Sequence, residues 1–314
     1  MGKIAFLFSG QGSQYVGMGQ EIANEYESAN QIFERANESL NFDIKKLCFE
    51  GPEEELVKTE NTQPAILTTS IAILQAVKEM GINADVTAGL SLGEYSALVY
   101  SDVLKFEEAV NLVKKRGKYM QEAVPLGKGT MAAIIGLDRE VVDGIIDSAK
   151  ETGVVEGANY NCPGQIVISG EVPAVEKACE LAKEKGAKRA IKLPVSAPFH
   201  SSMLKPAGDK LMEELKKVSI NKPTKKVISN VTANYISGDD DIRSLLMQQV
   251  SKSVLWEDSI RLMIEDGVDT FIEIGPGKAL TGFTKKISRK LKKKVTALNV
   301  ENLKTLGKLK QKLT

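Results

Sequence analysis

One serine stands in a setting that can make it a nucleophile. Ser91 is the centre of Gly89-Leu90-Ser91-Leu92-Gly93, a G-x-S-x-G string between a strand predicted over residues 84–89 and a helix predicted over 93–99. A sharp strand-to-helix turn lifts the serine oxygen into a cleft, and flanking glycines leave room for it. The string alone also fits a plain glycine-rich turn, so only the strand–turn–helix setting favours catalysis.

The only histidine of the chain, His200, is the one imidazole that could take a proton from Ser91. It lies in a loop where a predicted insert returns to the core, and such loops commonly carry function. An isolated histidine is more often structural, but pairing with Ser91 favours a general base. Many carboxylates lie between Ser91 and His200, and none stands in a distinctive motif, so a backbone carbonyl is an equally good partner for the second ring nitrogen.

Alternating strands and helices must position these two residues. A short apolar strand is predicted over 3–8, followed by a glycine-rich loop. Thr62-Gln63-Pro64 predicts the start of a helix that runs to about Met80, since threonine caps helices and proline is tolerated in a first turn. A long amphipathic helix is predicted over 105–123, and further core strands over 226–229 and 270–274.

Between these parts lies a segment with its own element order. Residues 131–193 read as β-α-β-β-α-β, which is typical of a ferredoxin-like subdomain. We therefore predict an α/β fold with a parallel sheet, an α/β-hydrolase-like core interrupted by a small α+β insert. The large catalytic subdomain would comprise residues 1–126 and 196–314, and the small one residues 127–195.

Composition places the chain among ordinary water-soluble proteins. It has 314 residues, of which 42% are hydrophobic and 26% charged. Three widely spaced cysteines, without any C-x-x-C pair, argue against a disulfide framework and a zinc site and suit a reducing compartment. No apolar run is long enough for a signal peptide or a membrane span. We predict a cytoplasmic protein without a membrane partner or a bound metal.

Charge is unevenly distributed. Residues 275–314 carry twelve Lys/Arg and one acidic residue, although the whole chain has a formal net charge of only +1. This basic end can face an acidic protein or a phosphorylated ligand, or it can be a solvated helix face. Its densest run, residues 285–294, has no interleaved aromatics, which argues against nucleic-acid binding.

Six motifs, in order along nearly the whole chain, resemble the acyltransferase family of fatty-acid and polyketide synthesis, and within it the malonyl-CoA:acyl-carrier-protein transacylases. They are Gly10-Gln11-Gly12-Ser13-Gln14, Gly89-Leu90-Ser91-Leu92-Gly93-Glu94-Tyr95-Ser96-Ala97, Arg116-Gly117-Lys118-Tyr119-Met120-Gln121, Asn161-Cys162-Pro163-Gly164-Gln165, Ala197-Pro198-Phe199-His200-Ser201 and Gly275-Pro276-Gly277-Lys278-Ala279-Leu280-Thr281-Gly282.

The resemblance implies a role for each matching residue. Ser91 would carry the acyl group and His200 would be its base. Gln11 and Leu92 would form the oxyanion hole through their backbone N–H groups. Arg116 would bind the substrate carboxylate. Gln249 would orient the imidazole through its backbone carbonyl, although adjacent Gln248 could hold the same position in the motif.

Two points in the sequence qualify these implied roles. The family usually has histidine before the nucleophile, where this chain has Leu90, which concerns nucleophile packing and acyl preference rather than the core reaction. On charge alone, residues 114–118 read as a basic helix face in solvent; only the resemblance favours Arg116 as a clamp, since a guanidinium binds a free carboxylate through two charge-assisted hydrogen bonds.

The implied activity is transfer of malonyl from malonyl-CoA to the phosphopantetheine thiol of acyl carrier protein, through a malonyl-serine ester, for fatty-acid elongation. The partners would be malonyl-CoA, CoA and acyl carrier protein, with no permanently bound cofactor and a monomeric enzyme. Two alternatives stay open: a serine hydrolase or thioesterase, and the same transfer serving polyketide synthesis or another acyl-CoA. A non-catalytic carrier-binding module is disfavoured because serine, histidine and arginine are all present.

Overall fold

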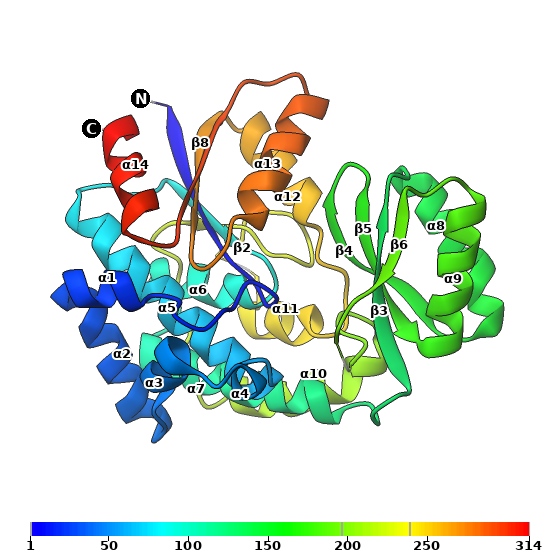
Figure 1. Ribbon diagram of the computed structural model, residues 1–314, viewed down its shortest axis with the longest axis horizontal. Helices are drawn as coiled ribbons and strands as arrows, with labels where there is room; N and C mark the ends of the chain where they lie inside the picture. Colours follow the sequence, from blue (N-terminus) through cyan, green and yellow to red (C-terminus); the bar gives the residue numbers. More distant parts are fainter. Residues whose placement is uncertain (1, 196, 239, 314) are drawn as a thin grey trace.

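A computed structural model describes residues 2–195, 197–238 and 240–313. Met1, Ser196, Asp239 and Thr314 lie outside the described residues, and three of them are ends of the predicted subdomains. Figure 1 shows a larger part that contains both ends of the chain and a smaller part built from the middle of the sequence.

A parallel five-stranded sheet with the order β7-β2-β1-β8-β9 forms the centre of the larger part. The central strand β1 is apolar along its buried length because helices cover both faces of the sheet, as parallel sheets require. It runs from the N-terminus toward the middle of the molecule (Figure 1). The strands are β1 Lys3–Phe8, β2 Val86–Gly89, β7 Lys226–Val227, β8 Val268–Ile274 and β9 Thr296–Val300.

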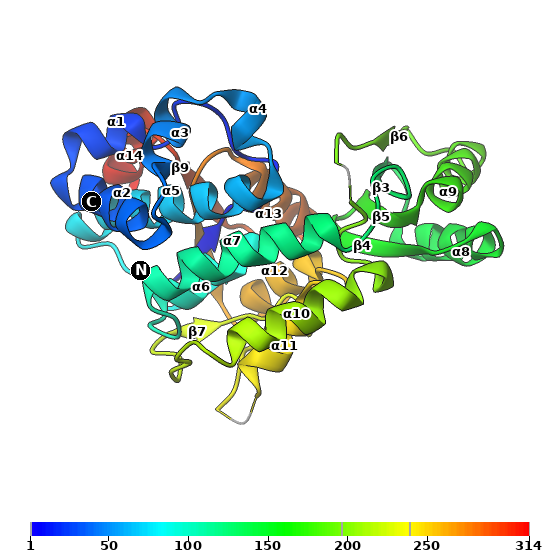
Figure 2. The ribbon, with the colours of Figure 1, turned by 90° about the horizontal axis from the view of Figure 1, so that it is seen from below.

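Helices α1 to α7, α10 to α14 and the 3₁₀ turn η2 surround this sheet (Figure 2). Their bounds are α1 Gln20–Glu25, α2 Glu27–Leu40, α3 Ile44–Glu50, α4 Glu53–Leu56, α5 Thr59–Glu79, α6 Leu92–Tyr100, α7 Phe106–Glu122, η2 Ser202–Leu204, α10 Lys205–Leu215, α11 Ile242–Gln249, α12 Trp256–Glu265, α13 Ala279–Lys290 and α14 Leu303–Leu313. No helix of the described residues is long and apolar enough to cross a membrane.

The start predicted for the long helix α5 is wrong by one turn. The helix begins at Thr59, and Pro64 lies inside it rather than in its first turn. The Thr62 hydroxyl does not cap; it donates to the carbonyl oxygens of Leu56, at 2.6 Å, and Lys58, at 3.1 Å. Burial of nearly the whole helix outweighs the local start signal. The end is as predicted, since Gly81 follows with a φ of 75°.

The smaller part is an antiparallel four-stranded sheet with the order β4-β5-β3-β6, with α8 and α9 packed on it. Its element order is the predicted β-α-β-β-α-β, and it has a separate apolar core. Its elements are β3 Gly129–Ile135, α8 Arg139–Ala149, η1 Lys150–Thr152, β4 Val155–Cys162, β5 Gln165–Glu171, α9 Val172–Glu184 and β6 Arg189–Lys192. The predicted fold class is confirmed, and the exact subdomain boundaries stay a prediction.

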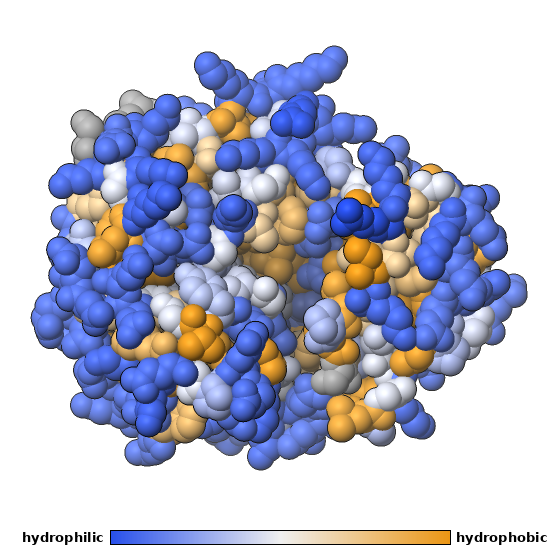
Figure 3. All heavy atoms as spheres, viewed as in Figure 1, coloured by the Kyte–Doolittle hydropathy of each residue, from blue (hydrophilic) through white to orange (hydrophobic). Residues whose placement is uncertain are grey.

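Strand β4 joins the two parts. The backbone N–H of Tyr160 donates to the carbonyl of Val254 at 3.0 Å, and the N–H of Val254 donates to the carbonyl of Ala158 at 2.8 Å. Figure 3 shows that the face is hollowed between the larger and the smaller part, with hydrophobic residues around the hollow. The carboxyl ends of β1 and β2, where Ser91 follows, point toward this junction (Figure 1).

Candidate active site

Ser91 occupies the turn between β2 and α6. Its backbone has φ 53° and ψ −102°, a positive-φ conformation that a non-glycine residue adopts only under constraint. The flanking glycines are required by close backbone contacts: a Cβ on Gly89 would lie 1.9 Å from the Gly93 carbonyl carbon, and one on Gly93 would lie 2.1 Å from the Phe8 oxygen. The turn is thus the sharp strand-to-helix elbow that the sequence predicted.

The structure brings His200 onto this turn from 109 positions away. Its Nε2 lies 2.8 Å from the Ser91 Oγ, and its Nδ1 lies 2.8 Å from the backbone oxygen of Gln249. With a proton on Nδ1 donated to that carbonyl, Nε2 is free to accept the serine proton. Burial, with the positive charge of Arg116 adding to it, lowers the pKa of His200 to about 4, so the imidazole is neutral at pH 7.

Arg116 lies beside this pair and is only 1% exposed. Its Nη2 donates to the Ser91 Oγ at 3.1 Å and to the Gln249 Oε1 at 2.9 Å, and its Nη1 donates to the Gln63 Oε1 at 2.8 Å. Among the described residues its buried Nε has no hydrogen-bond partner. The reading of residues 114–118 as a solvent face therefore fails at Arg116, although the neighbouring lysines at 115 and 118 are exposed.

A buried layer of polar side chains lies under this site, and it includes Asn230, which sequence reasoning missed, as well as Gln249. The Asn230 side chain accepts from the Ser91 N–H at 2.6 Å and donates to the Gly89 carbonyl at 2.8 Å. The Gln249 amide donates to the Ser91 carbonyl at 3.0 Å and to Glu94. A sequence signal could have found Asn230, because it directly follows a predicted parallel strand, where functional residues gather. Gln63, which sequence reasoning also missed, stands at the end of a polar stretch and carries no such signal.

The two residues implied for the oxyanion hole lie on adjacent segments. Leu92 is the first residue of α6, and helix amino ends present backbone N–H groups that the helix does not use. Gln11 follows Gly10 in the loop after β1; a Cβ on Gly10 would lie only 2.5 Å from the Leu90 carbonyl oxygen. This loop therefore packs directly against the nucleophile turn. Leu90, the departure from the family pattern, donates its N–H to the Phe8 carbonyl at 3.2 Å.

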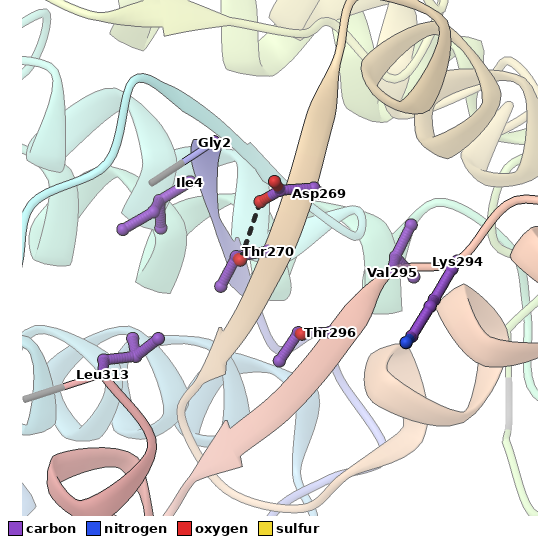
Figure 4. Close-up of a pocket in the computed structure, with 8 residues that line it drawn as sticks. All are labelled: Gly2, Ile4, Asp269, Thr270, Lys294, Val295, Thr296 and Leu313. Atoms are coloured by element: carbon purple, nitrogen blue, oxygen red, sulfur yellow. Dashed lines mark hydrogen bonds between the residues drawn. The ribbon is translucent and has the colours of Figure 1, made fainter.

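A different pocket, of about 320 Å³, opens at the amino ends of the parallel strands. Figure 4 shows its lining, in which Asp269 accepts a hydrogen bond from the Thr270 hydroxyl. No converging set of catalytic side chains lines it. Within the described part of the chain there is also no group of three or more His, Cys, Asp or Glu residues that could hold a metal ion.

The site holds a buried serine–histidine pair on a strand–turn–helix elbow, next to the loop after β1 and the amino end of α6. This arrangement is typical of enzymes that pass an acyl group through a serine ester. Here a backbone carbonyl takes the place of the usual acid. A third element, the buried guanidinium, adds a site for an anionic acyl group. These features define the class as serine acyl-transfer enzymes.

Comparison with known proteins gives the family. Residues 5–314 match the acyl transferase domain family. The chain is 54% identical to a malonyl CoA-acyl carrier protein transacylase of Bacillus subtilis over 293 residues, 93% of this chain and 92% of that protein. The chain therefore belongs to the acyl transferase domain family, and the resemblance stated from its six motifs is confirmed.

Solved structures agree with this assignment. A malonyl CoA-acyl carrier protein transacylase from Clostridium perfringens is 56% identical and superposes with a TM-score of 0.96, covering 99% of this chain and 97% of that one. A malonyl-transacylase solved in complex with a type II PKS acyl-carrier protein is 41% identical, with a TM-score of 0.94 and 99% of both chains covered.

Proposed function

We propose that this chain transfers a malonyl group from malonyl-CoA to the phosphopantetheine thiol of acyl carrier protein. The observation that carries the proposal is the buried guanidinium of Arg116, which donates to the oxygen of a histidine-paired serine. A site built this way favours an acyl group that ends in a carboxylate. The names of the relatives point to the same substrate and the same acceptor.

In the first half-reaction Ser91 attacks the thioester carbonyl. His200 takes the Oγ proton on Nε2, while its Nδ1–H stays bonded to the Gln249 carbonyl, which stabilises the imidazolium that forms. The carbonyl oxygen becomes an oxyanion that accepts from the N–H groups of Gln11 and Leu92. Each such donor typically supplies about 2.7–4 kcal/mol of transition-state stabilisation. CoA leaves as the thiol, with the proton that His200 returns.

Acyl selectivity comes from Arg116. The distal carboxylate of a malonyl ester lies only two carbons from the ester carbonyl, which suits a guanidinium next to the serine oxygen. The contact from Nη2 to the Ser91 Oγ can be exchanged for a charge-assisted bond to this carboxylate. An acetyl group would leave a buried donor unpaired, which costs about 1–3 kcal/mol.

In the second half-reaction the carrier thiol attacks the malonyl-serine ester and His200 acts again, first as base and then as acid. The cycle is therefore ping-pong. The basic run at residues 285–294 would attract an acidic carrier protein and the phosphates of CoA, which predicts a rate that falls with added salt. We further propose that the enzyme works as a monomer in the cytoplasm, without a permanent cofactor, and supplies fatty-acid elongation.

The deciding experiment follows radiolabelled malonyl-CoA in the presence of holo acyl carrier protein. We expect most of the label on the carrier, and none on apo carrier, which lacks the thiol. Free malonate as the main product would contradict transfer and favour a thioesterase. Carrier proteins of fatty-acid and polyketide synthesis, compared in parallel, would then distinguish the two destinations by their kcat/KM.

A further inference from the structure

One buried carboxylate beside the site has no part in the reaction described so far. Glu94 is the third residue of α6 and is only 1% exposed. A buried carboxylate is rare unless it is paired, because leaving water is costly for a charge. Across the residues that the structure describes, no cationic nitrogen lies within 4.0 Å of Glu94; its partners are the N–H groups of Gln249 and Asn230.

The first partner, the side chain of Gln249, links Glu94 to the reacting groups. Its Nε2 donates to the Glu94 Oε2 at 2.5 Å, and its Oε1 accepts from the Arg116 Nη2 at 2.9 Å. The reverse amide orientation would set donor against donor at Arg116 and acceptor against acceptor at Glu94. The carboxylate therefore fixes which end of the amide faces the guanidinium. The backbone oxygen of the same residue holds the His200 Nδ1.

The second partner, Asn230, links Glu94 to the nucleophile turn. The backbone N–H of Asn230 donates to the same Glu94 Oε2 at 3.1 Å. Its side chain holds the Ser91 N–H and the Gly89 carbonyl, on both sides of the constrained backbone of Ser91. Strained conformations persist only where the surroundings over-determine them. One carboxylate oxygen thus anchors the residues that position the serine, the histidine and the arginine.

We propose that Glu94 is a positioning residue for acyl transfer, whose acceptor oxygen holds Gln249 and Asn230 so that Ser91, His200 and Arg116 keep their mutual geometry. This role rests on the proposed function for its biological meaning, but the geometry that it describes can be tested on Ser91 reactivity alone. Burial raises the pKa of Glu94 to about 7, and the bonds from Gln249 and Asn230 and the charge of Arg116 oppose that rise, as expected for an acceptor held by donors.

Another buried carboxylate provides a matched control. Glu273 is also 1% exposed and accepts two backbone N–H groups, from Leu280 at 3.1 Å and Thr281 at 2.7 Å. Those donors belong to α13, and among the described residues neither forms a hydrogen bond with Ser91, His200 or Arg116. Removing Glu273 should therefore lower stability without changing the reactivity of Ser91 in the folded protein.

The test measures how fast a carboxylate-free fluorophosphonate labels Ser91, by intact mass spectrometry on folded protein. We expect Glu94→Ala to label at least tenfold more slowly than the wild type. Glu94→Gln, which keeps an acceptor oxygen, should label within threefold, and Glu273→Ala within twofold. A Glu94→Ala rate within twofold of the wild type would overturn the proposal, and so would a Glu94→Gln rate as low as that of Glu94→Ala.

Two further readings exclude a merely structural effect. Because the chain has one histidine, ¹⁵N-histidine NMR reports His200 alone, and Glu94→Ala should move its Nδ1 resonance; slow labelling with an unmoved resonance contradicts the proposal. Gln249→Met cuts the same link, so it should slow labelling at least tenfold, and the double variant should be no slower than the slower single variant. If the fold-losses in labelling rate of the two single variants multiply in the double variant, Glu94 does not act through Gln249.

Gln249→Met carries the test if Glu94→Ala does not fold, and a rate within twofold of the wild type would then refute the role. The labelling reaction needs neither malonyl-CoA nor carrier protein. A chain that fails to transfer malonyl but shows these labelling ratios refutes the proposed function alone. A chain that transfers malonyl normally as Glu94→Ala refutes the positioning role alone.

Discussion

The two ends of the parallel sheet differ in a way that identifies the site. At the carboxyl ends of the strands, a buried serine, histidine and arginine lie within hydrogen-bonding distance of one another or of a shared glutamine. At the amino ends, a pocket of about 320 Å³ has Asp269 bonded to its neighbour Thr270, without converging reactive groups (Figure 4). Convergence of buried polar groups marks the chemistry.

The difference has a physical origin. Parallel strands deliver their following loops to one edge, so residues distant in sequence meet there. Buried polar groups at that edge are held by one another, which makes each of them expensive to remove. In the pocket at the amino edge, the Asp269 carboxylate instead accepts from a single neighbour, the Thr270 hydroxyl. The predictions below should therefore show large effects at one end of the sheet and almost none at the other.

The largest effect is expected for His200→Ala. Without the imidazole, nothing in the site takes the Ser91 proton, and acylation by malonyl-CoA should slow by at least about 10³-fold. Rapid-quench measurement of the acyl-enzyme gives the rate. A loss of less than tenfold would mean that another group is the base and that the pair at 2.8 Å is not the reacting pair.

A smaller and selective effect is expected for Arg116→Ala. Loss of the charge-assisted bonds should lower kcat/KM for malonyl-CoA by about 100-fold, equivalent to about 3 kcal/mol, with a much smaller loss for acetyl-CoA. Lys115→Ala is the matched control on the same helix, because Lys115 pairs with Glu214 at the surface. If the preference for malonyl over acetyl survives in Arg116→Ala, the clamp is misassigned.

The pH at which the acylation rate falls on the acid side should be unusually low. Burial and the charge of Arg116 lower the pKa of His200 to about 4, and only the neutral ring accepts the serine proton, so acylation should stay maximal at pH 6 and fall as the pH drops toward 4. In Arg116→Ala the pKa of His200 should rise, since a nearby positive charge disfavours the imidazolium. NMR titration of the single histidine measures both values; a wild-type midpoint at 6.5 contradicts the account.

The smallest effect is expected at the other end of the sheet. Asp269→Ala removes the acceptor of the Thr270 hydroxyl in the pocket of Figure 4. This pocket lies at the amino ends of the strands, whereas Ser91 follows the carboxyl end of β2. Malonyl transfer should stay within twofold of the wild type, measured as kcat/KM. A tenfold loss would show that this pocket takes part in the reaction and would remove the contrast between the two ends.

Local signals in the sequence predicted much of this structure. Glycines spaced around Ser91 predicted the elbow because close backbone contacts forbid side chains there. Hydrophobic periodicity predicted the β-α-β-β-α-β order of the smaller part. Because the chain has one histidine, the sequence predicted that His200 pairs with Ser91. In the structure the His200 Nε2 lies 2.8 Å from the Ser91 Oγ.

Other features depend on tertiary packing and leave little trace in the sequence. The burial of Arg116 among exposed lysines follows from Gly117, where a Cβ would lie 2.5 Å from the Thr59 oxygen of α5, so the two helices pack at close range. The partner of the His200 Nδ1 is a backbone oxygen, which no residue type encodes. The role of Gln63 likewise appears only once the chain is folded.

The most direct test of the central claim is the mass of the intact protein after brief exposure to malonyl-CoA. The account predicts one malonyl adduct that maps to Ser91, that is absent in Ser91→Ala, and that disappears when holo acyl carrier protein is added as the carrier gains the same mass. No adduct, an adduct on another residue, or an adduct that persists in Ser91→Ala would contradict it.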